Sequence, residues 1–363
     1  MQPLRYPEGK TMTVIRRFLL AVAALAASFP AASAGADPHP QPPIIHLHYD
    51  YMVDADGFSY APSDEAVRIV VESFRDRGIV LHVDPHHAAI PARRVLVLEG
   101  RSPGYPDPME QYAGTDFAYL ADLKAQYFDP PQPNRAYHYV IFGHYDSCAS
   151  PAQCAARSAA TRGTYRFRAL GIAFIGGYDF IVSLGLFRDL GRVPSDIQVA
   201  GILMHELGHN LGLRHGGSDG LDLKPNYISV MNNNFITRGI GTAAGVGGIE
   251  PVSVRIDYSD RALPALDETA VDESVGLQSG TNDISFTNCF LGLTPIPGTG
   301  PVDFNCDGDS TDAFGMELNL SPLGGGLVGE DYLEGHDDWS FVHAVLQTPA
   351  YFRAQRPLGE VSH

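Results

Sequence analysis

The sequence has little charge, no excess of basic residues and few cysteines, and the first two shortages each exclude a class of protein. Charged residues make up only 18% of the 363 positions and hydrophobic residues 44%, a balance that excludes an intrinsically disordered chain and argues against a coiled coil. The 25 Lys and Arg against 42 Asp and Glu give a net charge of −17. Because such a chain repels phosphate backbones, we expect no nucleic-acid partner.

The N-terminus has the pattern of a targeting segment. An Arg-Arg pair at 16–17 precedes an apolar run at 18–29, and Ala-Ser-Ala at 32–34 offers a cleavage site. This pattern predicts a signal peptide over residues 1–34 and a secreted or periplasmic mature protein. A transmembrane anchor needs about 20 apolar residues, whereas this run is shorter and ends in Pro30. No second run of membrane length follows, so we expect no membrane span in the mature chain.

Four cysteines follow the predicted cleavage site: Cys148, Cys154, Cys289 and Cys306. An even number in an exported chain predicts two disulfides, for which three pairings exist. Proximity favours Cys148 with Cys154 and Cys289 with Cys306. No C-x-x-C spacing supports zinc binding by these thiols.

Alternating strand and helix patterns predict a sheet with helices packed on it. Strands are expected at 44–51, 79–83, 94–98 and 137–143, and helices at 63–77, 116–126 and 196–211. Beyond residue 231 the chain becomes rich in glycine and proline. We expect an irregular C-terminal third that closes with a helix at 338–346, where Trp339 is a packing anchor.

Residues 205–215 read HELGHNLGLRH. They fall in a predicted helix that is almost continuously apolar and therefore buried. His205 and His209 are four residues apart, so both imidazoles project from one helix face and can bind the same ion. Gly212 allows a left-handed turn that ends the helix. The chain can then return His215 as a third ligand.

Three neutral imidazoles leave the fourth tetrahedral position open for water, which is typical of a catalytic rather than a structural zinc. Zinc brings the pKa of such a water to about 7. The carboxylate of Glu206, next to the first histidine, can reach that water and act as general base. The alternative is a core helix that merely carries these side chains. Burying them without a shared partner would be costly.

The motif resembles the signature of the metzincin clan of zinc endopeptidases, H-E-x-x-H-x-x-G-x-x-H followed by a methionine turn. Ser-Val-Met-Asn at 229–232 fits that turn, and the resemblance places Met231 under the zinc as an apolar floor. It also implies an α+β fold, in which a twisted mixed sheet with backing and active-site helices lies above an irregular lower part. The upper subdomain would span 35–215 and the lower one 216–363, together forming one catalytic unit.

The segment 170–176 resembles the strand at the upper rim of the cleft in adamalysin-like members. There an extended protein or peptide substrate pairs with the edge strand; an ordinary buried strand is the alternative. Gly216 matches none of the better-known metzincin families. Asn233 stands where astacins and serralysins carry a tyrosine, so Tyr227 or Tyr258 is considered for the oxyanion instead.

The resemblance implies an exported zinc endopeptidase that uses zinc-activated water and the Glu206 base. One alternative is a catalytically silent, zinc-containing binding or surface protein. Another is a zinc hydrolase of a non-peptide amide or ester. Silent relatives usually lose the base or a ligand, whereas this sequence retains both, and the endopeptidase is therefore preferred.

Two weaker patterns suggest further metal sites. The segment 303–309 copies the opening of an EF-hand loop, in which calcium would bind Asp303, Asn305, Asp307 and Asp309. Phe314 occupies the twelfth position, where a glutamate is expected; Asp312 can substitute through a shorter loop, and a solvated acidic turn is the alternative.

Five histidines also gather in the sequence near the first two strands. A second metal site is the less favoured reading of these residues, because no carboxylate or cysteine completes a recognised pattern. We expect surface or rim positions for His46, His48, His82, His86 and His87.

Overall fold

The structure, a computed structural model, describes residues 41–93, 95–98, 117–132, 135–143, 146–148, 170–244, 251–289, 292–319, 332–349 and 351. All of them except residue 41 belong to one compact unit, Pro42–His363. The predicted signal peptide and Cys154 lie outside the described residues, so export stays a prediction. Cys306 takes part in a disulfide, but the expected pairings and the division at residue 215 also stay predictions.

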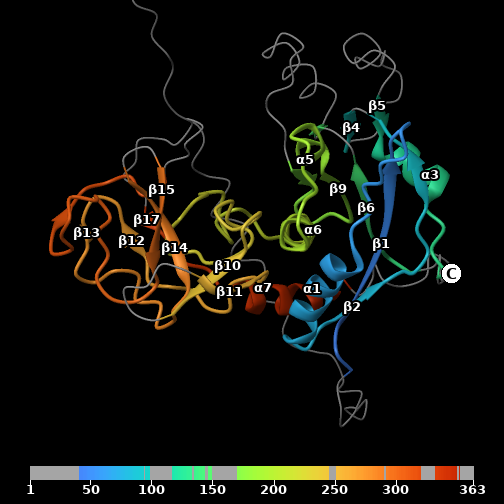
Figure 1. Cartoon of the computed structure of the whole chain (residues 1–363). Coiled ribbons are helices and arrows are strands. Elements are labelled where there is room, and N and C mark those ends of the chain that lie inside the picture. Colours follow the sequence, from blue (N-terminus) through green and yellow to red (C-terminus); the bar gives the residue numbers. More distant parts are fainter. Residues whose placement is uncertain are drawn as a thin grey trace, which may run out of the picture. The chain divides into compact units, whose positions relative to one another are not determined.

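A mixed sheet of six strands, which we term the central sheet, lies in the right-hand part of Figure 1. Its order is β2-β1-β6-β9-β8, with β3 also paired to β1. All neighbours run parallel except β8, which is antiparallel to β9. This arrangement confirms the predicted mixed sheet. The strands are β1 (Ile44–Val53), β2 (Val80–Val83), β3 (Ala89–Pro91), β6 (His138–Gly143), β8 (Gly171–Ala173) and β9 (Asp179–Ser183).

A second, three-stranded parallel sheet has the order β5-β4-β7, with β4 at Val95–Val97, β5 at Phe117–Tyr119 and β7 at Asp146–Cys148. The helix expected at 116–126 therefore starts later, as α3 (Leu120–Tyr127). Aromatic Phe117 and Tyr119 pair in register with β4, and aromatic residues favour strands over helices.

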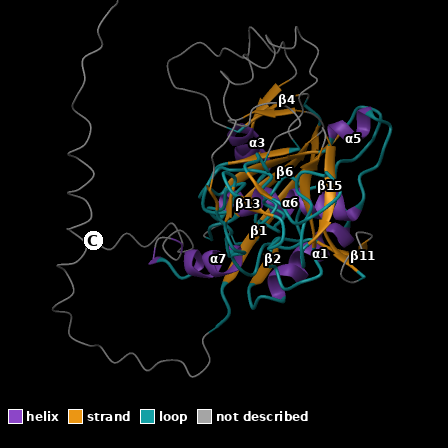
Figure 2. Ribbon diagram, turned by 90° about the vertical axis from the view of Figure 1, so that its left-hand side faces the viewer, coloured by secondary structure: helices purple, strands orange, loops and turns teal. Residues whose placement is uncertain are grey.

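Helices cover both faces of the central sheet (Figure 2). α1 (Asp64–Arg75) begins where Ser63 accepts a hydrogen bond from the N–H of Ala66, and it packs against α6 (Asp196–Asn210). On β6, His138 reaches Asn210 of α6, whereas the next residue, Tyr139, lies under Lys124 of α3. Because successive strand residues point to opposite faces, α3 lies on the face away from α6. A short helix, α5 (Gly185–Asp189), follows β9.

The C-terminal third is more regular than predicted. It contains four two-stranded antiparallel sheets, β10 with β11, β12 with β17, β13 with β16 and β14 with β15. Two-stranded ribbons have only edge strands, which tolerate the prolines of this region. The bounds are β10 (Ile240–Ala243), β11 (Pro251–Arg255), β12 (Leu266–Asp267), β13 (Val271–Asp272), β14 (Ile284–Cys289), β15 (Gly292–Pro297), β16 (Ala313–Phe314) and β17 (Tyr332–Leu333).

The closing helix, α7 (Asp338–Leu346), is present as predicted. Trp339 is 3% exposed, its ring packs on Phe74 and Tyr258, and its Nε1 donates a hydrogen bond to Asp257 at 2.8 Å. The predicted packing role of Trp339 is thereby confirmed, and α7 joins the main hydrophobic core.

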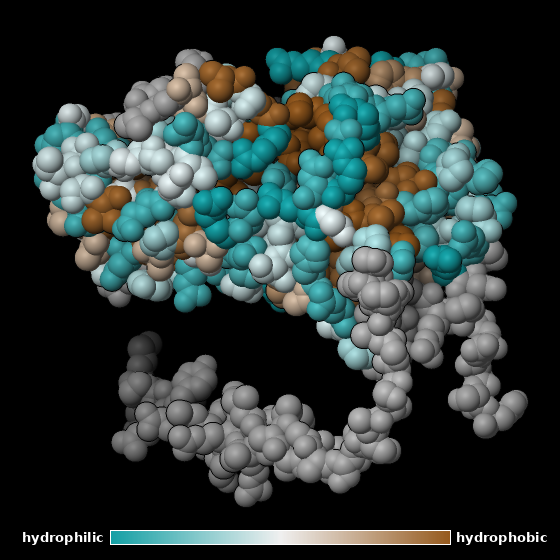
Figure 3. All heavy atoms as spheres, turned by 90° about the horizontal axis from the view of Figure 1, so that it is seen from below, coloured by the Kyte–Doolittle hydropathy of each residue, from teal (hydrophilic) through white to brown (hydrophobic). Residues whose placement is uncertain are grey.

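A second, smaller core lies within the C-terminal third. It is formed by Val271, Leu277, Ile296, Val302, Phe304, Leu318 and Leu333. On the face seen in Figure 3, apolar residues show in patches between hydrophilic ones. None of the described helices combines the length and the apolar character that crossing a bilayer requires.

The expectation of surface or rim positions is wrong for two of the five histidines. His46 is 5% and His48 only 1% exposed, because α3 and the chain after it cover this face of β1; the ring of Phe128 packs edge-on against His48. The two nitrogens of His48 lie 2.8 Å from Asp84 and 3.3 Å from Asp50. Burial lowers the pKa of His48, but its hydrogen bonds to these carboxylates outweigh burial and raise it.

Candidate metal centre

The predicted helix that carries the histidines forms as α6, and two reciprocal hydrogen bonds cap its first turn. Ser195 accepts a hydrogen bond from the N–H of Gln198, and the Gln198 side chain accepts one from the N–H of Ser195. This capping box satisfies two backbone donors that a helix start leaves open. From residue 199 to 210 every side chain is buried, as the apolar sequence predicts.

Two glycines within α6 mark where later parts of the chain pack on the helix. A Cβ at Gly201 would lie 2.1 Å from the carbonyl oxygen of Ile236, and one at Gly208 would lie 2.3 Å from Sδ of Met231. Each glycine costs about 1 kcal/mol relative to alanine within a helix, but here only glycine fits. Met231 is fully buried against the turn of α6 that carries the histidines, which is where the resemblance places an apolar floor.

The chain reverses at the end of α6 through a Schellman motif. Gly212 has a φ of 101°, its N–H donates to the carbonyl of His209 at 2.9 Å, and the N–H of Leu213 donates to Gly208 at 2.9 Å. This left-handed turn confirms the role predicted for Gly212. A tight turn follows, and it brings His215 back over the helix.

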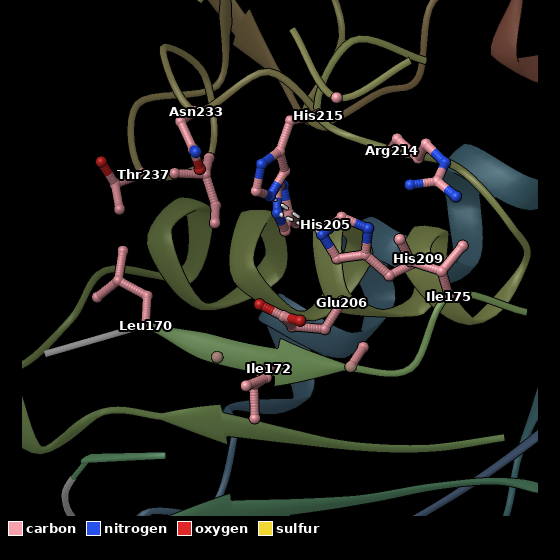
Figure 4. A pocket seen from close by; sticks show the side chains of 14 residues that line it. Leu170, Ile172, Ile175, His205, Glu206, His209, Arg214, His215, Asn233 and Thr237 are labelled. Atoms are coloured by element: carbon pink, nitrogen blue, oxygen red, sulfur yellow. Dashed lines mark hydrogen bonds between the residues drawn. The ribbon is translucent and has the colours of Figure 1, made fainter. Parts of the chain in front are cut away.

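Three histidines, His205, His209 and His215, form what we term the imidazole cluster (Figure 4). Nε2 of His209 lies 3.1 Å from Nε2 of His205 and 3.2 Å from Nε2 of His215. On the other side of the rings, Nδ1 of His205 lies 2.8 Å from the carbonyl oxygen of Val230, and Nδ1 of His209 lies 2.9 Å from that of Leu213.

The hydrogen bonds at Nδ1 determine which ring nitrogen carries the proton. A carbonyl oxygen can only accept, so Nδ1 of His205 and of His209 is the donor and each Nε2 keeps its lone pair. Burial lowers the pKa of His205 well below its usual range and that of His209 to about 4, so both rings are neutral near pH 7. A cation between these nitrogens would remove the repulsion of lone pairs held this close together.

Zinc fits this arrangement. Two imidazoles on a tetrahedral zinc, each at about 2.0–2.1 Å, have their nitrogens about 3.3–3.4 Å apart, close to the 3.1 and 3.2 Å seen here. The Nδ1–carbonyl hydrogen bonds are the outer contacts that commonly orient histidine ligands. These three residues therefore have the donor type and the spacing that zinc requires, and His205 and His209 also have the protonation state.

Glu206 projects from α6 toward β8 (Figure 4) and is 4% exposed. A Cβ at Gly171 of β8 would lie 2.4 Å from its Oε1, so the glycine makes room for the carboxylate. Its Oε2 has no hydrogen-bond partner, and burial raises the pKa of Glu206 well above the usual range. A cation in the imidazole cluster would favour the charged form.

Glu206 and the imidazole cluster line the same pocket of about 740 Å³. Its opposite wall is β8, the last strand of the sheet, together with Ile175, which is 48% exposed. The strand expected over 170–176 is thus an edge strand at the rim of the pocket and not an ordinary buried one. The remaining lining residues come from the chain after α6: Arg214, Gly220, Asn233, Ile236 and Thr237.

Neither tyrosine considered for the oxyanion reaches this pocket. Tyr258 donates a hydrogen bond at 2.6 Å to the carbonyl oxygen of Met204, and Tyr227 donates at 2.8 Å to the carboxylate of Asp338. Both are 1% exposed and belong to the main core. The interpretation that one of them binds the oxyanion is wrong, because both hydroxyls form hydrogen bonds within the core behind the pocket.

Lys224 is one of two supporting residues that the sequence does not reveal. It is fully buried, and its Nζ donates to the carbonyl oxygens of Gly216 at 2.8 Å and Glu334 at 2.7 Å. A Cβ at Gly216 would lie 2.5 Å from the backbone carbonyl oxygen of Leu221 and 2.9 Å from that Nζ, which explains the glycine after the third histidine. No periodicity or spacing distinguishes this lysine from an exposed one.

The second is Asp338, a fully buried carboxylate at the start of α7. It accepts hydrogen bonds from Tyr227 and Ser229, which lead into the turn of Met231, and from the backbone of Ser259. The sequence shows only an acidic residue in a first helical turn, where acidic residues are common.

The structure places the predicted calcium residues in two groups. One carboxylate oxygen from each of Glu273, Asp309 and Asp312 lies within 4.8 Å of the other two, and we term these residues the acidic cluster. Repulsion, chiefly by Asp309, raises the pKa of Asp312. Asp303, Asn305 and Asp307 shape the adjoining loop instead.

No protein-family model and no curated protein matches this chain. Among solved structures, it is similar to an archaemetzincin from Methanopyrus kandleri, with 17% identity, a TM-score of 0.27, and coverage of 52% of this chain and 81% of the other. It is also similar to a zinc-dependent peptidase from Methanocorpusculum labreanum, with 14% identity, a TM-score of 0.25, and coverage of 51% and 87%. At TM-scores this low, the fold and chemistry of this chain rest on its own residues.

Proposed function

We propose that this chain is an exported, metzincin-type zinc endopeptidase. The proposal rests mainly on one observation: three imidazoles converge through Nε2 in the same pocket that holds a buried glutamate, one oxygen of which has no hydrogen-bond partner among the described residues. The H-E-x-x-H-x-x-G-x-x-H sequence and the packing of Met231 under the helix support the same assignment.

The residues have distinct roles in this proposal. His205, His209 and His215 hold the zinc ion, which supplies Lewis-acid chemistry that acidifies water and polarises a carbonyl group. Glu206 accepts the proton of the attacking water on its carboxylate and returns that proton to the leaving amine. Burial excludes other water from this carboxylate, so that the proton moves only between Glu206 and the reacting groups.

The edge strand β8 supports a peptide as the substrate. The N–H of Ser183 in β9 donates a hydrogen bond to the carbonyl oxygen of Leu170, which directly precedes β8. Hydrogen-bonded pairs alternate along antiparallel strands, so the backbone N–H and C=O groups of Gly171 and Ala173 point away from β9. Both residues line the pocket. An extended peptide can add to this edge as a further strand, which places its backbone along the imidazole cluster.

The first test combines metal content with cleavage of a denatured, quenched-fluorescent protein. We expect near one zinc per chain and cleavage that phenanthroline abolishes. Glu206→Gln should retain zinc but lose activity by about 10²–10⁴-fold. Glu268→Gln is the matched control. Glu268 is also a buried glutamate, but it accepts the backbone N–H of Leu318 and does not line the pocket. Zinc without cleavage of any protein or ester would favour the catalytically silent binding protein.

A second test separates peptides from small amides and esters. Ala173→Pro removes an N–H on the free side of β8, a position that tolerates proline in edge strands. We expect kcat/KM for a long peptide to fall about tenfold, the cost of one hydrogen bond of about 1.4 kcal/mol, while hydrolysis of a small activated ester is unchanged. An equal loss for both substrates, or ester hydrolysis alone in the wild type, would contradict a peptide bound along β8.

A further inference from the structure

The loop at 303–312 lacks the glutamate that an EF-hand loop places twelfth. Phe314 occupies that position, and its side chain packs against the second core. The loop is otherwise closed by its own side chains: the carboxylate of Asp303 accepts the N–H groups of Asp307 at 3.2 Å and Gly308 at 3.1 Å. A carboxylate to complete the oxygen set must come from another part of the chain.

Glu273, which directly follows β13, reaches into this loop. It is fully buried, and its Oε1 accepts the N–H groups of Phe304 at 2.7 Å and Asn305 at 3.2 Å. Its Oε2 is also buried and has no hydrogen-bond partner. Burying a carboxylate oxygen without a partner costs several kcal/mol unless a cation compensates it.

The acidic cluster has the spacing of ligands around one calcium ion. Calcium binds oxygens at about 2.3–2.6 Å, so two of its ligands lie at most about 5 Å apart. The oxygens of Glu273, Asp309 and Asp312 lie within 4.8 Å of one another. Ion pairs elsewhere in this third of the chain, Lys224 with Asp219 and Arg255 with Asp283, engage other carboxylates.

We propose that Glu273, Asp309 and Asp312 bind one calcium ion together with oxygens of the adjoining 303–307 segment. Glu273 takes the place of the missing twelfth glutamate. An all-oxygen, carboxylate-rich set favours calcium over zinc, which prefers nitrogen and sulfur. The ion would join β13, β16 and the loop over the second core, so its role is to stabilise the C-terminal third. This site is independent of the proposed peptidase activity.

Calorimetric titration tests this site on the full chain with its zinc retained. Calcium is first removed on a chelating resin, one equivalent of zinc is restored, and calcium chloride is titrated alone. We expect one saturable site per chain, a rise in melting temperature with calcium, and weaker binding of magnesium. No saturable binding, or equal affinity for magnesium, would overturn the proposal.

Two substitutions and one control locate the ion. Glu273→Gln keeps the acceptor for Phe304 and Asn305 but removes the charge, and Asp309→Asn removes the charge of an exposed residue and keeps an oxygen that can accept from Thr311. Each should weaken calcium binding about tenfold or more. Asp267→Asn is the matched control, because Asp267, like Asp309, is exposed and accepts the N–H and hydroxyl of a threonine two residues on. Equal effects of Asp309→Asn and Asp267→Asn would refute the site.

Discussion

The imidazole cluster and the acidic cluster differ in their donor atoms and in how the chain assembles them. Two imidazoles come from one turn of α6 and the third from the turn that follows it. Outer carbonyl groups of Val230 and Leu213 fix two of the rings. The three carboxylates come from residues 273 to 312, and only Glu273 is both buried and hydrogen-bonded to the neighbouring backbone.

This difference has consequences for metal choice and for stability. Neutral nitrogens on a buried helix suit zinc and keep their positions without it, because the helix and the carbonyl groups hold them. The carboxylates of the acidic cluster repel one another unless a cation lies between them. We therefore expect the proposed calcium ion to stabilise the loop at 303–312. The two clusters should therefore respond independently to substitution and oppositely to pH.

The largest effect is expected from His209→Ala. Removing the central imidazole should abolish stoichiometric zinc binding and cleavage, because two ligands remain of three. Calcium binding by the acidic cluster should not change. Metal analysis measures the zinc content, and calorimetric titration measures calcium binding. His343→Ala is the control, because His343 contacts the carbonyl oxygen of Arg77 and lies outside both clusters. Loss of both metals would show that the clusters are coupled.

The pH dependence of the metal-free protein gives the next largest effect. The pKa of His209 falls from 6.5 to about 4 in the folded chain because of burial, so its contribution to stability is present above pH 6.5 and is lost as the pH falls toward 4. Over this pH range the free energy of unfolding of the metal-free protein falls by about 3 kcal/mol. The raised pKa of Asp312 acts in the opposite sense, because its contribution is present at low pH and is lost as the pH rises through that pKa.

Melting curves of the metal-free wild type, His209→Ala and Asp312→Asn between neutral and acid pH measure these contributions. His209→Ala should flatten the loss of stability on acidification, whereas Asp312→Asn should steepen it slightly. Parallel curves for all three proteins would contradict the assigned directions.

The smallest effect is expected from Lys224→Met, which removes the donor that holds the turn of His215 through the carbonyl oxygen of Gly216. Zinc affinity should fall about tenfold, as for other residues that orient metal ligands. Activity should return at saturating zinc, which a purely structural defect would not allow. Lys124→Met is the control, because Lys124 pairs with Asp179 on the far side of the sheet. Unchanged zinc affinity with a lower melting temperature would contradict a positioning role.

Local patterns in the sequence predict much of the fold and the imidazole cluster. Ser63 and Ser195 cap the helices expected at 63–77 and 196–211, and capping depends on residues only three positions apart. His205 and His209 share a helix face because they are four residues apart. The left-handed conformation of Gly212 then reverses the chain toward His215. All of these features lie within a few residues of one another along the chain.

Contacts between distant segments could not be predicted. Glu273 has no local pattern that points to the loop at 303–312, and Lys224 resembles any exposed lysine until Glu334 is placed beside it. His48 was expected at the surface. Its partner Asp50 lies two residues away in β1, but Asp84 becomes a neighbour only when the chain after β2 reaches the same sheet face. Tertiary packing decides these positions, and hydrophobic periodicity does not encode it.

The central claim is that the imidazole cluster holds one zinc ion. Anomalous diffraction at the zinc absorption edge, from crystals of the chain purified without added metal, tests this claim most directly. We predict one strong peak at about 2.0–2.1 Å from Nε2 of each of His205, His209 and His215. The absence of a peak there, or a zinc peak only at the acidic cluster or the cysteines, would contradict the account.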